Sequence, residues 1–156
     1  MRRASFLISA LIFVSASPAA AVEGSVIFNG TILSTCLITI GTPGTLAANA
    51  DFTELSSEAP GGISGTATIL TTGIGYNLST SAPAAFTSAP AGGDDAVVFA
   101  SSYSASGVTS LLDVVGTVTS PLGLGLTNVD VDLTATKSSG NFPAGSYTAQ
   151  VTVTCE

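Results

Sequence analysis

Hydrophobic and polar residues alternate most regularly at the C-terminal end of the chain. In the stretch GSYTAQVTVTCE, every second residue from Tyr147 to Cys155 is apolar or a cysteine, and threonines and Gln150 stand between them. Because successive side chains of a β-strand point to opposite faces, this pattern predicts a strand over residues 147–155 with one buried face. The stretch VDVDLTAT (129–136) alternates in the same way and predicts a second strand, joined to the first by the loop 137–145.

Shorter apolar stretches, separated by glycine, proline and serine, fill the middle of the chain. They predict further strands at 63–72, 73–80, 96–106 and 108–120, the last with a bulge or turn near Gly116. The segments between them are typical of loops at 45–62 and 81–95 and of an irregular connector at 121–126. About seven short strands without helical periodicity predict an all-β fold, a β-sandwich, with a closed barrel as the second choice.

The first 21 residues, MRRASFLISALIFVSASPAAA, have the pattern of a secretory signal peptide. Arg2 and Arg3 form the basic region, an apolar stretch follows, and Ala19 and Ala21 form an A-x-A cleavage site. We therefore expect a signal peptide over 1–21 and a single domain over 22–156. The apolar stretch is too short for a membrane span, so no membrane-spanning segment is expected.

The segment that follows the predicted cleavage site has an imperfect alternation. In GSVIFNGTILSTCLITI, Val26, Phe28, Ile32 and Cys36 share one parity. Ile27 and Leu33 bring apolar side chains to the other parity as well. Hydrophobicity on both faces suits a strand that is buried on both sides, or one that docks into a partner. Residues 22–33 are therefore expected to form an N-terminal strand or arm.

The charge balance excludes several classes of partner. Removal of Arg2 and Arg3 with the signal peptide changes the formal net charge from −7 to −9 and leaves Lys137 as the only basic residue. Binding of nucleic acid requires clustered lysines and arginines that neutralise phosphates, so no nucleic-acid partner is expected.

Two cysteines, Cys36 and Cys155, remain in the predicted mature chain. In an exported protein, an even number of cysteines predicts a disulfide. A metal site is disfavoured because the chain has no histidine and a zinc ion takes four good ligands. No cofactor is expected.

The absence of histidine also removes the Ser-His and Cys-His pairs of hydrolytic enzymes. Asp130 and Asp132 share the outward face of one predicted strand, where solvation explains them. Asp94 and Asp95 follow two glycines but lack the spacing of a calcium loop. We therefore expect no enzymatic activity and no metal site.

The sequence VEGSVIFNGTILSTCLITI resembles the N-terminal region of bacterial fimbrial subunits of the chaperone–usher class. The residues that carry this resemblance are Gly24, Val26, Phe28, Gly30, Ile32 and Cys36. The C-terminal AGSYTAQVTVT is similar to the closing strand of such subunits and of spore-coat-U-like secreted proteins.

The resemblance implies an immunoglobulin-like (pilin-like) sandwich that lacks its last strand. In such subunits, the arm of a neighbour supplies the strand, and a periplasmic chaperone supplies it before assembly at an usher. By this resemblance, Val22, Gly24, Val26 and Phe28 are the donor-strand candidates, by insertion of alternate side chains into a groove. The alternative is that this segment is simply the first strand of its own domain.

The position of Cys155 departs from the fimbrial pattern, in which the second cysteine lies early in the fold. A disulfide requires Cα atoms about 4.4–6.8 Å apart, whereas strands that flank an empty groove are about 10 Å apart. Either the groove narrows at the cysteines, or the strands meet in another way, or the sandwich is complete by itself.

These observations together predict an exported bacterial structural or adhesive subunit, located between the periplasm and the cell surface, as part of a fimbrium, or outside the cell. Its expected partners are copies of itself or sibling subunits, a periplasmic chaperone and an usher. The alternative is a self-contained secreted or periplasmic β-sandwich that binds a ligand without polymerising, with the 81–95 loop as its binding edge.

Overall fold

A computed structural model describes residues 22–156 of the chain. The predicted signal peptide, residues 1–21, lies outside the described residues. The chain divides into two units between Thr31 and Ile32, and all the strands belong to the second unit, Ile32–Glu156.

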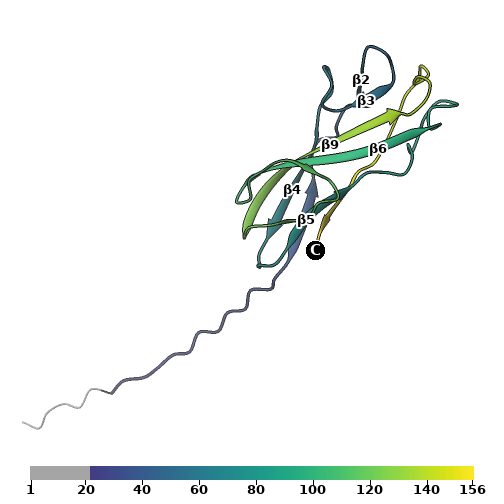
Figure 1. Cartoon of the computed structure of the whole chain (residues 1–156). Coiled ribbons are helices and arrows are strands. Elements are labelled where there is room, and N and C mark those ends of the chain that lie inside the picture. Colours follow the sequence, from purple (N-terminus) through teal and green to yellow (C-terminus); the bar gives the residue numbers. More distant parts are fainter. Residues whose placement is uncertain (1–21) are drawn as a thin grey trace, which may run out of the picture. The chain divides into compact units, whose positions relative to one another are not determined.

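The second unit is an all-β sandwich built from antiparallel strands, and residues 22–156 contain no helix (Figure 1). The fold class predicted from the sequence is therefore correct. Ten strand elements are present rather than about seven, because several are only two or three residues long. They are β1 (Cys36–Ile40), β2 (Ala47–Ala48), β3 (Glu54–Ser56), β4 (Gly65–Thr71), β5 (Asn77–Ser81), β6 (Val97–Gly107), β7 (Leu111–Val115), β8 (Ser120–Pro121), β9 (Gly125–Lys137) and β10 (Thr152–Cys155).

The larger sheet is organised around β9, its longest strand at 13 residues. One edge of β9 pairs with β4 over its first half and with β3 over its second half, and its other edge pairs with β6 (Figure 1). β1 then pairs with β4, and β2 pairs with β3, so that residues 36–48 form one border of this sheet. The smaller sheet has the order β10-β5-β8.

The predicted irregularity near Gly116 is present. Strand β7 ends at Val115, and the amide of Val118 donates a hydrogen bond to the carbonyl of Val115 at 2.9 Å, which closes a turn around Gly116. Inside β7, Asp113 has a φ of 47° where its pairing with β6 shifts register. A positive φ is uncommon for an aspartate and is typical of a bulge.

The C-terminal segment differs from the predicted strand over 147–155. Only Thr152–Cys155 forms a strand, and it pairs with β5. In the part before it, one isolated antiparallel bridge joins Thr148 to Ser88. The predicted alternation nevertheless persists in the burial, since Tyr147, Ala149 and Val151 are half-buried while the residues between them are exposed. The segment is therefore oriented as a strand but lacks a partner along most of its length.

The 45–62 segment is also more ordered than a loop. It contains β2 and β3, joined by a turn in which the side-chain oxygen of Asn49 accepts a hydrogen bond from the amide of Thr53 at 2.9 Å. The strands are too short for their alternation to be visible in the sequence.

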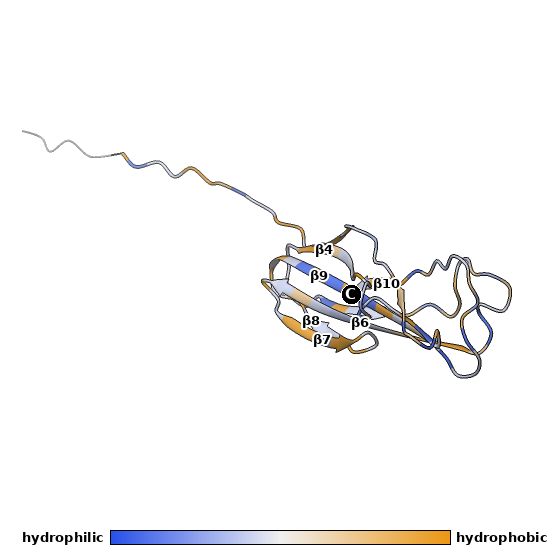
Figure 2. Cartoon of the chain, turned by 90° about the horizontal axis from the view of Figure 1, so that it is seen from above, coloured by the Kyte–Doolittle hydropathy of each residue, from blue (hydrophilic) through white to orange (hydrophobic). Residues whose placement is uncertain are grey.

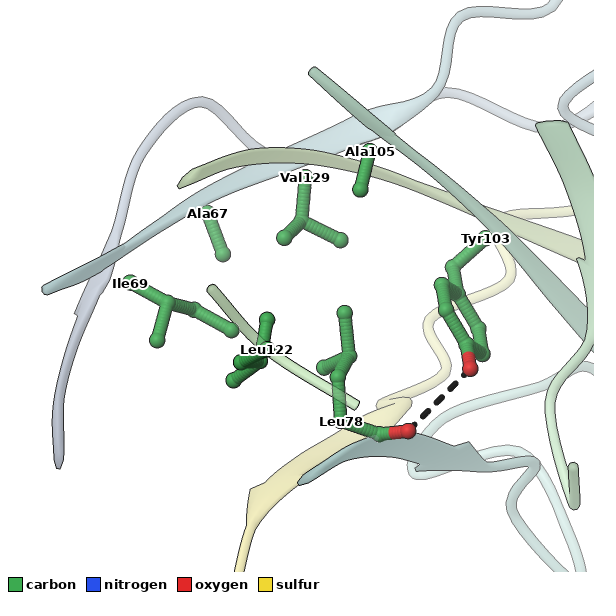
Figure 3. Close-up of a cluster of buried hydrophobic side chains, with 7 residues drawn as sticks. All are labelled: Ala67, Ile69, Leu78, Tyr103, Ala105, Leu122 and Val129. Carbon is green, nitrogen blue, oxygen red and sulfur yellow. Dashed lines mark hydrogen bonds between the residues drawn. The ribbon is translucent and has the colours of Figure 1, made fainter. Parts of the chain in front are cut away.

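The core consists of two clusters of buried side chains. One lies between the two sheets and contains Ala67, Ile69, Leu78, Tyr103, Ala105, Leu122 and Val129 (Figure 3). The other contains Leu55, Phe86, Ala135 and Phe142, with Phe99 and Tyr147 packed against it. Several of its aromatic rings meet edge to face, an arrangement that their quadrupoles favour, as in the pair Phe86–Phe99 with centroids 4.8 Å apart.

Residues 22–35 form no strand, and the first strand begins at Cys36. Hydrophobic and hydrophilic positions follow one another along this segment (Figure 2). The apolar side chains of residues 22–33 are all exposed, among them Val26 at 76% and Phe28 at 91% of their surface. Among residues 22–156, no helix is long and apolar enough to cross a membrane.

Candidate functional site: an apolar groove between the first and last strands

A groove of 1130 Å³ runs along one side of the sandwich, within residues 40–153. One flank consists of the segment from Ile40 to Ala48, with Phe52 beyond it. The other flank consists of the C-terminal segment from Pro143 to Val153. The volume exceeds the 300–1,000 Å³ that is usual for small-molecule pockets, and the shape follows two extended segments.

The floor of the groove is the apolar inner face of the larger sheet. Leu55 from β3, Ala67 from β4, and Val131 and Leu133 from β9 line it. Their side chains alternate with polar residues along each strand, as expected for a face turned toward the core. The smaller sheet, with only three strands, does not cover this part of the larger sheet.

The backbones on the two flanks have no partner on the groove side. Within the described residues, β1 pairs with β4 and β10 pairs with β5, each along its other edge. No backbone hydrogen bond between residues 40–48 and 147–153 is present in this part of the chain. Two unpaired strand edges on either side of an apolar floor form a template for an additional strand.

The groove contains no charged side chain among the residues that line it. Apolar residues alternate there with threonine, serine and glycine. A partner that carries a charge into this groove would lose its hydration without gaining an ion pair, which is unfavourable. The chemistry of the site therefore favours an extended, uncharged, apolar segment.

The disulfide between Cys36 and Cys155 lies at one end of the groove. It brings the Cα atoms of the two residues to 6.4 Å from each other. The groove lining starts only at Ile40 on one flank and ends at Val153 on the other. The lining of the groove therefore stops short of the cysteines, where the first and last strands approach each other.

The residues just before β1 continue the line of that strand. The amide of Thr35 donates to the side-chain oxygen of Thr72 at 2.9 Å, and the Thr72 hydroxyl donates to the carbonyl of Leu33 at 2.7 Å. The amide of Thr72 donates in turn to the carbonyl of Thr35 at 2.9 Å. These bonds hold residues 33–35 on the β4 side of β1, away from the groove.

The four donor-strand candidates, Val22, Gly24, Val26 and Phe28, all belong to the unit before Ile32. All four are exposed, and nothing lies within 4 Å of the position that a Cβ atom would take at Gly24. Sequence analysis did not identify the groove residues themselves. Their only signal was the alternation of 147–155, which places Tyr147, Ala149, Val151 and Val153 on one face.

The 81–95 loop, the expected binding edge of the alternative interpretation, is held firmly. Phe86 is buried in the aromatic cluster, and its amide donates to the Asp94 carboxylate at 2.8 Å. The Nζ atom of Lys137 donates to the carbonyl oxygens of Gly92 and Asp95 at 2.8 and 2.7 Å. Lys137 is only 8% exposed, and its ammonium lies over the ring of Phe142 at 5.3 Å from the centroid.

The carboxylates of Asp130, Asp132 and Glu58 lie in different surroundings. Asp130 is exposed, as expected, but Asp132 is half-buried and accepts hydrogen bonds from the hydroxyls of Ser57 and Ser64, each at 2.6 Å. Burial raises the pKa of Glu58 above its ordinary value, and Asp132 and Asp113 raise it further. No group of three or more histidine, cysteine, aspartate or glutamate residues among 22–156 could hold a metal ion.

No protein-family model matches the chain, and no curated protein and no solved structure matches it either.

Proposed function

We propose that this protein is an exported structural or adhesive subunit whose groove accepts an extended segment from another subunit as an additional strand. One observation carries this proposal: two unpaired backbone edges flank an uncharged, apolar groove. A strand placed there gains main-chain hydrogen bonds on both sides and buries every second side chain against the floor of the larger sheet.

The N-terminal arm of a second copy is the occupant with the best match in length. Residues 40–48 line one flank, and nine residues of a strand span about 30 Å at roughly 3.3 Å per residue. Residues 22–31 have about the same length when extended. Val22, Gly24, Val26 and Phe28 share one parity, which puts their side chains on the floor. Glu23, the one charged residue of the arm, has the opposite parity and faces solvent.

The arm of the same copy is a poor candidate for its own groove. The hydrogen bonds of Thr35 and Leu33 with Thr72 direct the chain away from the groove at the start of β1. To fill its own groove, the arm would have to reverse within a few residues and pass the disulfide. Insertion into a second copy requires neither step.

The proposal includes the cellular setting that the sequence predicts. The Cys36–Cys155 disulfide is compatible with an oxidising compartment outside the cytosol. The proposed partners are sibling subunits, an usher, and a periplasmic chaperone that shields the groove before assembly. We propose no enzymatic activity.

The experiment compares two arm substitutions in the protein that starts at Val22. Phe28→Asp places a charge on the parity that faces the floor, and Ile27→Asp places the same charge on the parity that faces solvent. We expect concentration-dependent oligomers, measured by size-exclusion chromatography with light scattering, for the native arm and for I27D. We expect only monomers for F28D and for a protein that lacks residues 22–30.

The same measurement separates this proposal from the alternative. A self-contained binding module would stay monomeric with the intact arm at all concentrations and would melt cooperatively at the same temperature with and without it. That result would exclude assembly through the arm. Equal loss of oligomers in I27D and F28D would exclude the proposed face of the arm while leaving assembly in place.

A further inference from the structure

The Cys36–Cys155 disulfide has a further consequence for the groove, which rests on the proposed function. We propose that it is an end stop: it fixes the register of the inserted arm and restricts the groove to an arm whose free N-terminus lies at the disulfide.

The spacing of the two flanks limits where a strand can be inserted. A strand in a sheet lies about 4.7–4.9 Å from each neighbour, so two strands with a third between them are about 10 Å apart. At Cys36 and Cys155, the Cα atoms are 6.4 Å apart and the bond between them is covalent. No backbone can pass between β1 and β10 at that level, and an inserted strand has to end near Ile40 and Val153, the nearest residues that line the groove.

The end of the groove opposite the disulfide is built differently. There the lining consists of Ala48, Phe52 and the small residues around Ala144. The tie near this end is a hydrogen bond from the amide of Phe142 to the carbonyl of Phe52 at 2.7 Å, which is not covalent and can open, unlike the disulfide. The side chain of Phe52 remains 57% exposed. A chain can therefore continue out of the groove at this end once that hydrogen bond opens, whereas the disulfide end stays closed.

The two ends of the arm differ. It has a free end at Val22 once the predicted signal peptide is removed, and at Ile32 it continues into a folded unit. The folded unit cannot lie where the disulfide closes the groove. Val22 therefore lies beside Ile40 and Val153, and Thr31 lies beside Phe52. In this direction the arm runs parallel to β1 and antiparallel to residues 147–153.

Removal of the residues before Val22 then becomes a condition for insertion. An arm that still carries residues 17–21 has two options at the end stop. It either bends out of the sheet at Val22, or it slides by five residues toward the open end, which draws Phe28 out of the groove and, because five is odd, turns the remaining side chains to the other face. Both options weaken binding, whereas additional residues at the other end of the arm leave the groove freely.

The test uses three peptides labelled with a fluorophore at the C-terminus: residues 22–33, residues 17–33, and residues 22–33 followed by the same five residues, SPAAA. They are titrated into the monomeric F28D variant of the chain from Val22, and fluorescence anisotropy is measured. We expect the peptide extended at its N-terminus to bind about tenfold more weakly, or worse, than residues 22–33. The matched peptide extended at its C-terminus should keep the affinity of the unextended one.

A second measurement reads the direction of the arm in the disulfide-bonded protein. A photoreactive phenylalanine at position 22 should attach to the region of Ile40 or Val153, and one at position 31 to the region of Phe52 or Ala144, as mapped by mass spectrometry. The double variant C36S/C155S should lose the difference between the two extended peptides. If that variant does not fold, the two measurements on the oxidised protein still decide the question.

The outcomes separate the two proposals. If none of the peptides binds, the proposed function fails, and the end stop fails with it. If the peptides bind but both extensions are tolerated equally, or the attachment sites are reversed, the end stop is wrong while docking of the arm stands.

Discussion

The side-chain hydroxyl of Tyr103 donates a hydrogen bond to the main-chain carbonyl oxygen of Leu78 at 3.1 Å, and both residues are completely buried (Figure 3). Tyr103 belongs to β6 of the larger sheet and Leu78 to β5 of the smaller sheet. The same hydroxyl lies 2.8 Å from the carbonyl oxygen of Val118 and 2.8 Å from the side-chain oxygen of Ser120, so three oxygen atoms share its one proton. The two layers of the sandwich are therefore joined by a polar contact in the interior, beside the apolar side chains of the core.

The first prediction concerns this contact. Tyr103→Phe keeps the ring but leaves the buried carbonyl of Leu78 and the buried hydroxyl of Ser120 short of a partner, which costs about 1–3 kcal/mol of unfolding free energy. Urea denaturation measures this loss. The matched control is Tyr76→Phe, because the Tyr76 hydroxyl contacts only the exposed Ser34 hydroxyl, at 3.3 Å. Equal stability of the two variants would contradict the prediction.

The second prediction concerns Lys137, whose ammonium holds the 81–95 loop through two carbonyl groups. Lys137→Met keeps an aliphatic stem of similar length but removes both charge-assisted hydrogen bonds and the cation over the Phe142 ring, so we expect a loss of about 1–2 kcal/mol. Amide hydrogen exchange should accelerate selectively at residues 92–95. Ser139→Ala, in the exposed turn that follows, serves as the control. Unchanged exchange in K137M would show that the loop is held by other contacts.

The third prediction concerns the disulfide as a source of stability. It joins residues 119 positions apart in the sequence. In the chain-entropy model, a loop of this length restricts the unfolded state by about 4–5 kcal/mol. The protein from Val22 should therefore unfold at a much lower urea concentration after reduction, and C36S/C155S should behave like the reduced protein. A midpoint that does not change on reduction would mean that the unfolded chain is already compact.

The fourth prediction concerns pH. Burial and the neighbouring carboxylates raise the pKa of Glu58 in the folded protein above its unfolded value. The folded state then binds the proton more tightly, so this contribution to stability is fully present below the unfolded pKa of about 4.3 and is lost as pH rises through the folded pKa.

Glu58→Gln removes this dependence. Relative to the native protein, we expect E58Q to gain stability as pH increases from about 4 toward neutral, as thermal melts at a series of pH values would show. Glu54→Gln is the control, since it makes the same change of charge in β3, four residues before Glu58. A constant stability difference between E58Q and the native protein across this range would contradict the assignment.

The long strands could be predicted because their pattern is local. β6 lies within one residue of its expected bounds, whereas β9 contains the expected 129–136 but begins four residues earlier, at Gly125, in the stretch expected to be an irregular connector. β2 and β3 could not be predicted, because two or three residues carry no period. Residues 147–151, expected to be part of a strand, do not form one for a different reason. Alternation orients the side chains, but a strand also requires a neighbouring strand to pair with, and in this stretch only Thr148 pairs with another residue, Ser88.

The groove could not be predicted from the sequence because its two flanks are about a hundred residues apart. Ile40–Ala48 and Pro143–Val153 meet only through the pairing of β1 with β4 and of β10 with β5 in different sheets. Lys137 was missed as well. A signal was present, since it follows Val129, Val131, Leu133 and Ala135 with the same inward parity, where a lysine is unusual.

The sequence by itself determined the all-β fold class, the largely apolar arm with Glu23 as its one charged residue, and the presence of a cysteine in each of the two terminal strands. These properties follow from composition and from a period of two residues, both of which are local. Tertiary structure alone decided that the edges flanking the groove stay unpaired and that the Cys36–Cys155 bond closes one end of it. An empty strand position is defined by which distant segments become neighbours, and no stretch of the chain encodes it alone.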